Sequence, residues 1–464
     1  EQAMCVAARN DRAFQRLKEA VFTAALDLDY EQYQFETTFS GMLLAALSGE
    51  PRAEEATGRA ETGAARKLSN GAELAAKLAL DVASLLRDDW RSVGISGDLT
   101  MTVPLLRGAG REIIREPLTQ AERDLANAIR TFERYRQTYA VSVATAYLGA
   151  LEAAQKLRNA QENERRLDKN SRRADMMFEA GRMQRIQVDQ ARSDLLAAGE
   201  SVIAARKAFE AKLDAFKMAI GLPPEARIEL DDGELVLLER KMSELTQDAE
   251  NGATSLPELE QACEIALAER LDLANTRSQV EDAARAVTIA ADALLADVSL
   301  TGKVSMDRLR ETGDGAFDGK EAWSARVKTD LPWNRRKERN AFRKKLIALD
   351  QAKRTLEAEE DNVKQSVRSG LRNVFAARSS FLNQGRAMQV ALLRVESNNL
   401  YLQSGRSTMR DVLEAESALL SARNALCSAM ILWRVSELEL WRDMGVLRVS
   451  EAGLWRQPDG EKHG

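Results

Sequence analysis

The sequence contains almost no histidine and few cysteines, which excludes most kinds of catalytic and metal site. Its only histidine is His463, and the three cysteines, Cys5, Cys263 and Cys427, lie far apart without a CxxC spacing. A zinc site, a catalytic Cys/His pair or a Ser/His/Asp triad cannot be assembled from these residues. We therefore expect no enzymatic activity, no metal and no cofactor, and we interpret each cysteine as a small buried hydrophobe.

The sequence also lacks long apolar runs, aromatic residues and an excess of basic charge. No run of about 18 apolar residues occurs, so we expect no transmembrane helix. Basic and acidic residues are interleaved with a net charge of -5, which argues against a nucleic-acid partner. Aromatic residues make up 5% of the chain and charged residues 30%, a composition typical of long helices that bury narrow Ala/Leu seams. The helical pattern is already present at residue 1, so we expect a mature or trimmed segment.

The most informative feature that is present is an internal duplication. Residues 180–198 and 404–422 align at a constant offset without a gap, and each segment is a helix break followed by a strongly helical run. The repetition identifies two equivalent hinges, at Gly181 and Gly405. The identical pairs are Gly181/Gly405, Arg182/Arg406, Val188/Val412, Ala191/Ala415, Ser193/Ser417, Leu195/Leu419, Leu196/Leu420 and Ala198/Ala422.

Hydrophobic periodicity predicts the same order of elements in both copies. In the first copy we expect a helix over 1–27, strands over 30–41 and 95–103, a long helix over 111–179 and a return helix over 186–221. In the second we expect a helix over 260–295, strands over 298–306 and 323–331 joined by a Gly/Asp-rich turn over 311–315, a long helix over 335–403 and a return helix over 409–444. A 69-residue helix is about 100 Å long, which no globular core requires.

Residues 44–92 do not give a single prediction. Asn70-Gly71 favours a hairpin turn, whereas residues 73–86 fit a short helix equally well, and we interpret the whole stretch as an extended loop. The resulting organisation is a first structural repeat over 1–224 with two strands and a hinge near 181, a linker over 225–257, a second repeat over 258–447 with a hinge near 405, and a C-terminal tail over 448–464.

The four predicted strands each have one apolar and one polar face. This pattern suits a closed barrel with lipid outside and water inside, and it also suits a half-buried antiparallel sheet packed on a helix. Four strands from one chain are too few for a wide barrel, so several chains would have to pool them. Long helices with narrow apolar seams favour the barrel, because such helices pack side by side around a solvated interior. Trp90, Trp323 and Trp333 flank the strands, where they would suit a membrane interface or ordinary packing.

The order and duplication of these elements resemble the TolC-type outer membrane efflux proteins of Gram-negative bacteria. The pieces that carry the resemblance are the Gly-Arg hinge with Val188-Asp189, the second hinge with Asp411-Val-Leu-Glu-Ala415, the strand exit Val103-Pro-Leu-Leu-Arg107, Thr145-Ala-Tyr-Leu148 and Gly221-Leu-Pro-Pro224. The resemblance implies a mainly α fold with a small β part. In it, long helical hairpins form an α-barrel tunnel, and four strands per chain contribute to a trimeric 12-stranded transmembrane β-barrel.

The same resemblance implies a function. The chain would be a passive outer-membrane exit duct of a tripartite efflux or secretion system, located in the outer membrane and extending into the periplasm. Its partners would be two further copies of itself, a periplasmic adaptor protein, an inner-membrane pump and outer-membrane lipid. The alternative is a soluble coiled-coil scaffold or adaptor, which the charge-rich helices also fit.

The resemblance also implies site residues. Asp411 and Glu414, which follow the second hinge one helical turn apart, correspond to an acidic periplasmic gate; an acid in a first helical turn is also explained by the helix dipole alone. Gln187 stands where a first-hinge gate residue is expected, and Arg406 and Arg410 are possible gate partners, as are Arg182 and Arg185. The hinges Gly181, Arg182, Met183, Gly405, Arg406 and Ser407 correspond to the adaptor-docking tips, although a plain helical-hairpin turn would look the same.

Overall fold

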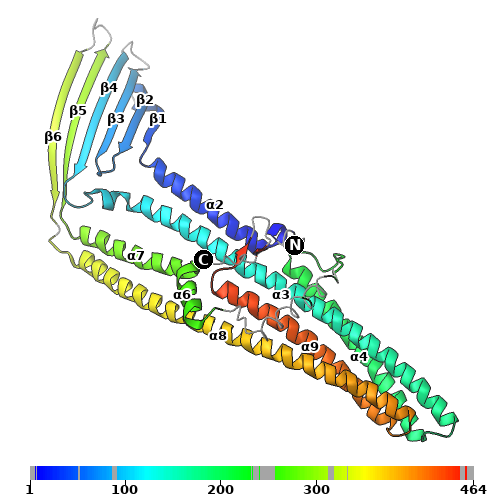
Figure 1. The fold of residues 1–464 in the computed structure, drawn as a ribbon. Helices are drawn as coiled ribbons and strands as arrows, with labels where there is room; N and C mark the ends of the chain where they lie inside the picture. The colour runs from blue at the N-terminus through cyan, green and yellow to red at the C-terminus, as the bar shows by residue number, and fades with distance from the viewer. Residues whose placement is uncertain are drawn as a thin grey trace. The chain divides into compact units, whose positions relative to one another are not determined.

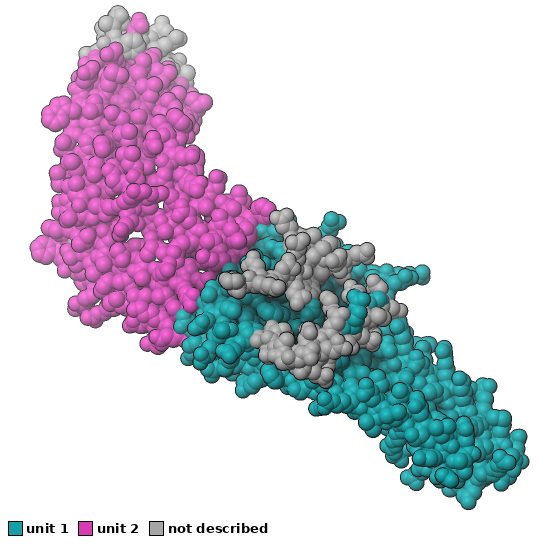
Figure 2. All heavy atoms as spheres, viewed as in Figure 1, with its two compact units in different colours: residues 1–18, 131–273, 358–464 teal, residues 19–130, 274–357 magenta. Residues whose placement is uncertain are grey.

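The computed structural model describes residues 6, 8–50, 53–85, 91–230, 233, 240, 257–311, 318–331, 333–449 and 455–456. The chain forms two compact units, coloured separately in Figure 2. Unit 1 comprises Glu1–Lys18, Thr131–Leu273 and Ala358–Gly464, and unit 2 comprises Glu19–Arg130 and Ala274–Glu357. Some expectations lie outside the described residues: those for residues 1–5 and 7, for Trp90, for most of the linker over 225–257, for the turn over 311–315 after its first residue, and for most of the tail.

Long helices dominate the chain, as the periodicity predicts. The expected helix over 111–179 is confirmed at both ends. The helices expected over 186–221, 335–403 and 409–444 begin and end within two residues of their predicted bounds. Among the described residues no helix is long and apolar enough to cross a membrane. The helices are α2 (Arg12–Tyr33), α3 (Arg111–Glu179), α4 (Arg185–Ala219), α6 (Leu259–Glu269), α7 (Leu271–Asp292), α8 (Arg336–Gln403) and α9 (Met409–Asp443), and Arg448–Val449 and Trp455–Arg456 pair as the short strands β7 and β8.

Unit 2 contains one antiparallel sheet of six strands in the order of the sequence, β1-β2-β3-β4-β5-β6 (Figure 1). The expectation of four strands per chain, two of them in the first repeat, is therefore wrong. The three strands predicted over 95–103, 298–306 and 323–331 are confirmed within β4, β5 and β6. The six strands are β1 (Thr37–Glu50), β2 (Ala53–Lys67), β3 (Glu73–Leu85), β4 (Arg91–Pro104), β5 (Asp297–Glu311) and β6 (Asp318–Asp330).

The loop expected over 44–92 is also wrong, because most of it forms β2 and β3. The alternative of a hairpin turn at Asn70-Gly71 is confirmed: the Leu68 amide donates to the Ala72 carbonyl at 2.8 Å, and Gly71 has φ +89°. Alanine, glutamate and arginine give β2 little intrinsic strand preference. Its backbone is nevertheless hydrogen-bonded along both sides, to β1 and to β3, and this tertiary pairing outweighs the local preference.

Two other boundaries differ from the prediction. The first strand, expected over 30–41, begins only at Thr37, because α2 continues to Tyr33. The helix expected over 260–295 is divided at Arg270, whose backbone is extended with φ -69° and ψ 119°. That conformation lets the Arg270 guanidinium bind both carboxylate oxygens of Asp272, at 2.9 and 2.5 Å. Burial opposes ionisation of Asp272, but Arg270 and Arg134 outweigh it and lower the pKa of this carboxyl.

The register of the sheet assigns its residues to two chemically different faces, because directly paired residues lie on the same side. One face carries large apolar side chains that are exposed in the single chain; Leu43 is 87% exposed and Trp323 is 82% exposed. The opposite face carries most of the charged residues of the sheet, interspersed with Ser, Thr and Ala, and its large apolar side chains among those described are Met42 and Leu44. The apolar face includes Phe39, Leu43, Leu47, Leu78, Leu80, Leu99, Met101, Val304, Trp323 and Val327.

Each unit is held together by contacts between helices distant in sequence. In unit 2 the Arg123 Nε lies 2.6 Å from Asp282 Oδ1, and the Arg285 Nε lies 3.0 Å from Glu116 Oε1, so that ion pairs join α3 to α7. In unit 1 one apolar cluster joins the hairpins α3–α4 and α8–α9, and each hairpin also has a cluster of its own; alanine, valine and leucine are the commonest residues in them. Small side chains allow the helices to approach closely along narrow seams.

Candidate functional site

The two predicted hinges form turns of the same geometry at one end of unit 1 (Figure 1). Gly181 and Gly405 have φ values of +67° and +68°, a left-handed conformation that glycine adopts without steric cost. At each turn the glycine amide donates to the carbonyl three residues back, and the following arginine amide donates to the carbonyl five residues back. This pair of bonds is a Schellman motif, which ends a helix and satisfies its last carbonyls.

The two hairpin tips pack against each other. Val188 of α4 and Val412 of α9, which occupy equivalent positions in the two copies, are both fully buried in one apolar cluster. Leu167 and Ala174 of α3, Leu402 of α8 and Met409 and Leu413 of α9 belong to the same cluster. The duplicated hinge segments thus form one structural tip, with the residues that follow each glycine presented on its surface.

Asp411 caps the start of α9. Its Oδ2 accepts hydrogen bonds from the Thr408 backbone amide at 2.8 Å, the Thr408 hydroxyl at 2.7 Å and the Ser407 hydroxyl at 3.1 Å. The Thr408 hydroxyl in turn accepts from the Asp411 amide, which completes a capping box. The hydrogen bonds from Thr408 and Ser407 hold the pKa of Asp411 below its usual value. The structure therefore gives this carboxylate a local role in helix capping.

Glu414, one turn further along α9, has a different environment. Its Oε1 lies 2.8 Å from Arg394 Nη2 of α8, in a pair whose two side chains are largely exposed. Among the described residues neither Arg406 nor Arg410 lies within ion-pair distance of Asp411 or Glu414. The partner that the structure supplies, Arg394, was not predicted from the sequence. It lies twenty residues before Glu414, on the other helix of the hairpin, where sequence spacing gives no signal.

The first hinge has no corresponding acidic pair. Gln187 and Gln190 occupy the equivalent positions, and the Gln190 amide donates to Asp194 Oδ1 at 3.0 Å. Arg185 lies 3.3 Å from Asp189 and also over the Phe178 ring, 5.7 Å from its centroid. Arg182 and Met183 lie in the turn itself, with Arg182 exposed. A pair of carboxylates at these two positions is consequently present in the second copy and absent from the first, where Asp189 is the acid nearest the hinge.

The main feature that sequence reasoning missed is a buried ion pair between α3 and α9, seven residues after the Thr408–Met409 start of α9. Glu416 Oε2 of α9 lies 2.8 Å from Arg166 Nε of α3, and the Glu416 side chain is only 4% exposed. Asn159 and Asn163 are buried on the same stretch of α3, and Asn159 donates to Asn424 Oδ1 of α9 at 2.9 Å. The signal in the sequence was an acidic residue within the apolar seam of α9, between Val412 and Leu419.

A group of exposed apolar side chains beside the hinges was also missed. Phe178, Ile186, Leu400 and Tyr401 are all exposed, and each lies within five residues of Gly181 or Gly405. Exposed apolar groups at a helical tip are typical of a surface that contacts another protein. Their signal was weak, because single apolar residues near a turn also occur at ordinary surfaces.

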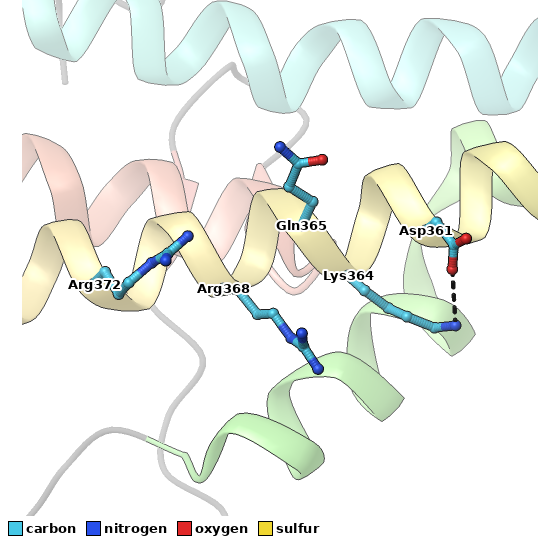
Figure 3. Close-up of a pocket in the computed structure, with 5 residues that line it drawn as sticks. All are labelled: Asp361, Lys364, Gln365, Arg368 and Arg372. Atoms are coloured by element: carbon cyan, nitrogen blue, oxygen red, sulfur yellow. Dashed lines mark hydrogen bonds and ion pairs between the residues drawn. The ribbon is translucent and has the colours of Figure 1, made fainter.

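A shallow cavity of about 510 Å³ lies along α8 in unit 1 (Figure 3). Lys364, Arg368 and Arg372 line it at four-residue intervals, and Lys364 Nζ lies 3.3 Å from Asp361 Oδ1. The row is a solvated basic helix face that offers no enclosed binding site. In the described parts of the chain no group of three or more His, Cys, Asp or Glu side chains is placed to hold a metal ion.

Comparison with known sequences decides the family. The chain matches the sequence model described as "Outer membrane efflux protein" over residues 88–222 and 262–446. It belongs to this family. The two matched segments contain the two hinges, so the duplication, the tip and the family assignment concern the same residues. No curated protein sequence matches the chain.

Solved structures share its fold. The outer membrane protein VceC of Vibrio cholerae matches with a TM-score of 0.67 at 15% identity, over 96% of this chain and 95% of that one. The CmeC outer membrane channel of Campylobacter jejuni matches with a TM-score of 0.66 at 14% identity, over 99% and 86%. The open state of the MtrE outer membrane channel of Neisseria gonorrhoeae matches with a TM-score of 0.66 at 14% identity, over 96% and 89%. This outer membrane efflux protein thus has the fold of solved outer-membrane channels.

Proposed function

We propose that three copies of this efflux protein assemble into a passive conduit that receives substrates from an inner-membrane pump through a periplasmic adaptor. The observation that carries the proposal is the sheet of unit 2. It has one apolar face that is exposed in the single chain, and its outer strands, β1 and β6, each pair with only one neighbour among the described residues.

Such a sheet is unstable in lipid on its own. An unpaired backbone amide or carbonyl costs several kcal/mol in the hydrocarbon region, so membrane-spanning strands occur in closed barrels. Pairing β6 of one copy with β1 of the next satisfies both edges and turns all apolar faces toward lipid. A soluble scaffold, the alternative considered from the sequence, would leave the same face in water.

The helices of unit 1 support association of several copies. Leu196 and Ile203 on α4 are exposed and spaced seven residues apart, and Leu393 and Leu400 on α8 repeat this arrangement. Apolar residues at this interval form a second seam on a helix whose first seam is already buried within the chain. Neighbouring copies provide surfaces that would cover these seams.

The proposed docking surface is the structural tip. It comprises the turn residues Gly181, Arg182, Met183, Gly405, Arg406 and Ser407, together with the exposed side chains of Phe178, Ile186 and Tyr401 beside them. The glycine at each turn leaves its surroundings open, since no atom lies within 4 Å of the position that a Cβ would occupy there. Another helical tip can therefore approach the backbone closely.

The proposed gate is the ring of carboxylates that Asp411 and Glu414 of three chains would form. The two residues contribute differently: Asp411 is engaged in capping, whereas Glu414 is held only by an exposed pair with Arg394, which is worth at most about 1 kcal/mol. Glu414 is therefore the carboxylate that can reorient toward passing cations. Arg406, Arg410 and Gln187 are proposed as secondary gate residues.

Conductance recordings in planar lipid bilayers test both the proposed conduit and the proposed carboxylate gate. The purified protein should form discrete channels that prefer cations and are blocked by multivalent cations. The Glu414→Gln variant should show weaker cation preference and weaker block, and Asp361→Asn, which removes another exposed paired carboxylate, should resemble the wild type. An unchanged Glu414→Gln channel would remove this residue from the gate. A monomeric protein that is soluble without detergent and gives no conductance would refute the duct itself.

A further inference from the structure

The strands β2 and β3 are the part of the sheet that neither the sequence pattern nor the family match explains. The family match begins at residue 88, after β3 has ended and just before β4 begins at Arg91. We propose that β2 and β3 are an additional hairpin in the membrane wall, so that the barrel contains six strands from each chain and eighteen in a trimer. The proposal rests on the trimeric duct proposed above.

The hydrogen-bond ladder shows that β2 and β3 are continuous with the rest of the sheet. The pairing of β1 with β2 runs from Thr37↔Arg66 to Glu50↔Ala53, and that of β2 with β3 from Glu55↔Leu85 to Lys67↔Glu73. The pairing of β3 with β4 covers a similar length, from Glu73↔Thr102 to Ser84↔Arg91. A hairpin folded against the outside of the barrel would leave β1 to pair directly with β4, which does not occur.

The apolar face of the sheet continues across the added strands. Leu78, Leu80 and Val82 of β3 pair with Gly97, Ile95 and Val93 of β4, and all six positions lie on the face that carries Phe39 and Trp323. On β2 the same face carries small residues, including Ala56, Ala60 and Ala64. Between its two ends this face of β2 and β3 is uncharged, as contact with lipid requires; its one charge among the described side chains, Arg66, lies near the end of β2.

The opposite face of β2 and β3 carries charges that pair with one another. Glu61 lies 3.3 Å from Arg59 and 3.1 Å from Lys77, and Arg59 lies 3.7 Å from Asp81. The polar row continues on β4 and β5, where Lys303 lies 2.9 Å from Asp98. Charges on the lipid side of a barrel strand are strongly unfavourable, so this face belongs inside, against water. Both faces of the added hairpin therefore match those of its neighbours.

The topology allows this hairpin to be present or absent without changing the direction of any other strand. Because consecutive strands are antiparallel, β4 runs opposite to β1, and a chain without β2 and β3 could pair β1 directly with β4. Such a chain would contain four strands and would form a 12-stranded trimer. The two extra strands per chain are thus an insertion that enlarges the barrel without changing the order or direction of the other strands.

The expected consequence is a wider exit. With strands about 4.8 Å apart and tilted by about 40°, the backbone radius is about 12 Å for twelve strands and about 18 Å for eighteen. If inward side chains occupy about 5 Å, half the usual spacing of packed sheets, the open cross-section of the lumen increases about threefold. The insertion adds a balanced set of charges to this lumen, since Arg59 and Lys77 are matched by Glu61 and Asp81.

Electron cryomicroscopy of the full chain in lipid nanodiscs tests the proposal directly through the strand count. We expect eighteen strands for the wild type and twelve for a variant that lacks residues 53–85, with the trimer retained. A wild-type trimer with twelve strands would overturn the proposal but leave the duct intact. A chain that forms no membrane-embedded trimer would contradict the duct and the eighteen-stranded barrel together.

Spin labelling of the full-length protein provides a second test that does not depend on the deletion variant. After replacement of the native cysteines by alanine, nitroxide labels are attached through Leu80→Cys and Asp81→Cys on β3, with Leu99→Cys and Asp98→Cys on β4 as matched controls. Labels at 80 and 99 should be accessible to oxygen in the lipid, and labels at 81 and 98 to a water-soluble nickel chelate. If both β3 labels are accessible mainly to the nickel chelate while the β4 pair alternates, β3 lies outside the wall and the proposal is wrong.

Discussion

The buried pair between Arg166 and Glu416 leads to a prediction about which partner is more costly to remove. The Glu416 side chain is 4% exposed and its Oε2 lies 2.8 Å from Arg166 Nε, whereas the Arg166 side chain is 25% exposed. Arg166 also has a second acidic neighbour, since its Nη1 lies 3.8 Å from Glu162 Oε2. Removing the arginine therefore leaves an almost fully buried charge without an ion partner, but removing the glutamate does not.

These differences set the expected magnitudes. The Arg166→Met variant should lose about 3 kcal/mol of local stability, the low end of the range for breaking a buried ion pair on one side. The Glu416→Gln variant keeps a hydrogen-bond acceptor and leaves Arg166 near Glu162, so it should lose only about 1 to 2 kcal/mol. The double variant Arg166→Met/Glu416→Leu should lie within about 1 kcal/mol of the wild type, because both charges are removed together.

Hydrogen exchange of the α9 amides around Glu416, measured on the assembled protein in detergent, reports this local stability. A loss of about 3 kcal/mol corresponds to exchange faster by more than about a hundredfold. Amides of α7 from Ala274 onward, which lie in unit 2, provide an internal control that should not change. Equal effects of the two single variants, or a double variant less stable than Arg166→Met, would refute the reasoning from burial and the second acidic neighbour.

Three further predictions concern the hinges and the cap. Gly405→Ala should destabilise its turn by about 1 to 2 kcal/mol, because φ is +68° although the space around the position is open. Gly445→Ala should lower the stability further, because φ is +76° and the added Cβ would lie 3.0 Å from the Glu269 carbonyl. The melting temperatures of the two variants compare these losses. Thr408→Ala should cost about 1 kcal/mol and Thr408→Ser much less, seen as faster exchange in the first turn of α9. Because folding lowers the pKa of Asp411, its contribution to the stability of the α9 cap is complete above the ordinary aspartate pKa and is lost as pH falls through the lowered value. Hydrogen exchange in the first turn of α9 should therefore accelerate in acid, and Asp411→Asn should abolish this acceleration. An identical pH profile in the variant would contradict the capping role of Asp411.

The sequence alone determined the features that depend on local periodicity. The constant offset between residues 180–198 and 404–422 identified both hinges, because a left-handed turn requires glycine at the same place in each copy. The long helices and the strands β4, β5 and β6 were predicted for the same reason: their apolar residues repeat at helical or strand intervals over many positions. The family resemblance depended on the order of these elements, and the family match confirmed it.

Only the tertiary structure decided the features that depend on distant partners. The residues of β2 form a strand because β1 and β3 supply hydrogen bonds on both sides, and its Ala/Glu/Arg-rich sequence alone does not show this. Asp411 and Glu414 are both acids in the first turns of α9, yet Asp411 accepts hydrogen bonds from Thr408 in the helix cap and Glu414 pairs with Arg394 of α8. Glu416 is buried because Arg166 lies opposite it on α3, 250 residues earlier in the chain. For β2, Glu414 and Glu416 the deciding energy is a hydrogen bond or an ion pair between segments that only folding brings together, whereas the cap at Asp411 is made within one turn of the chain.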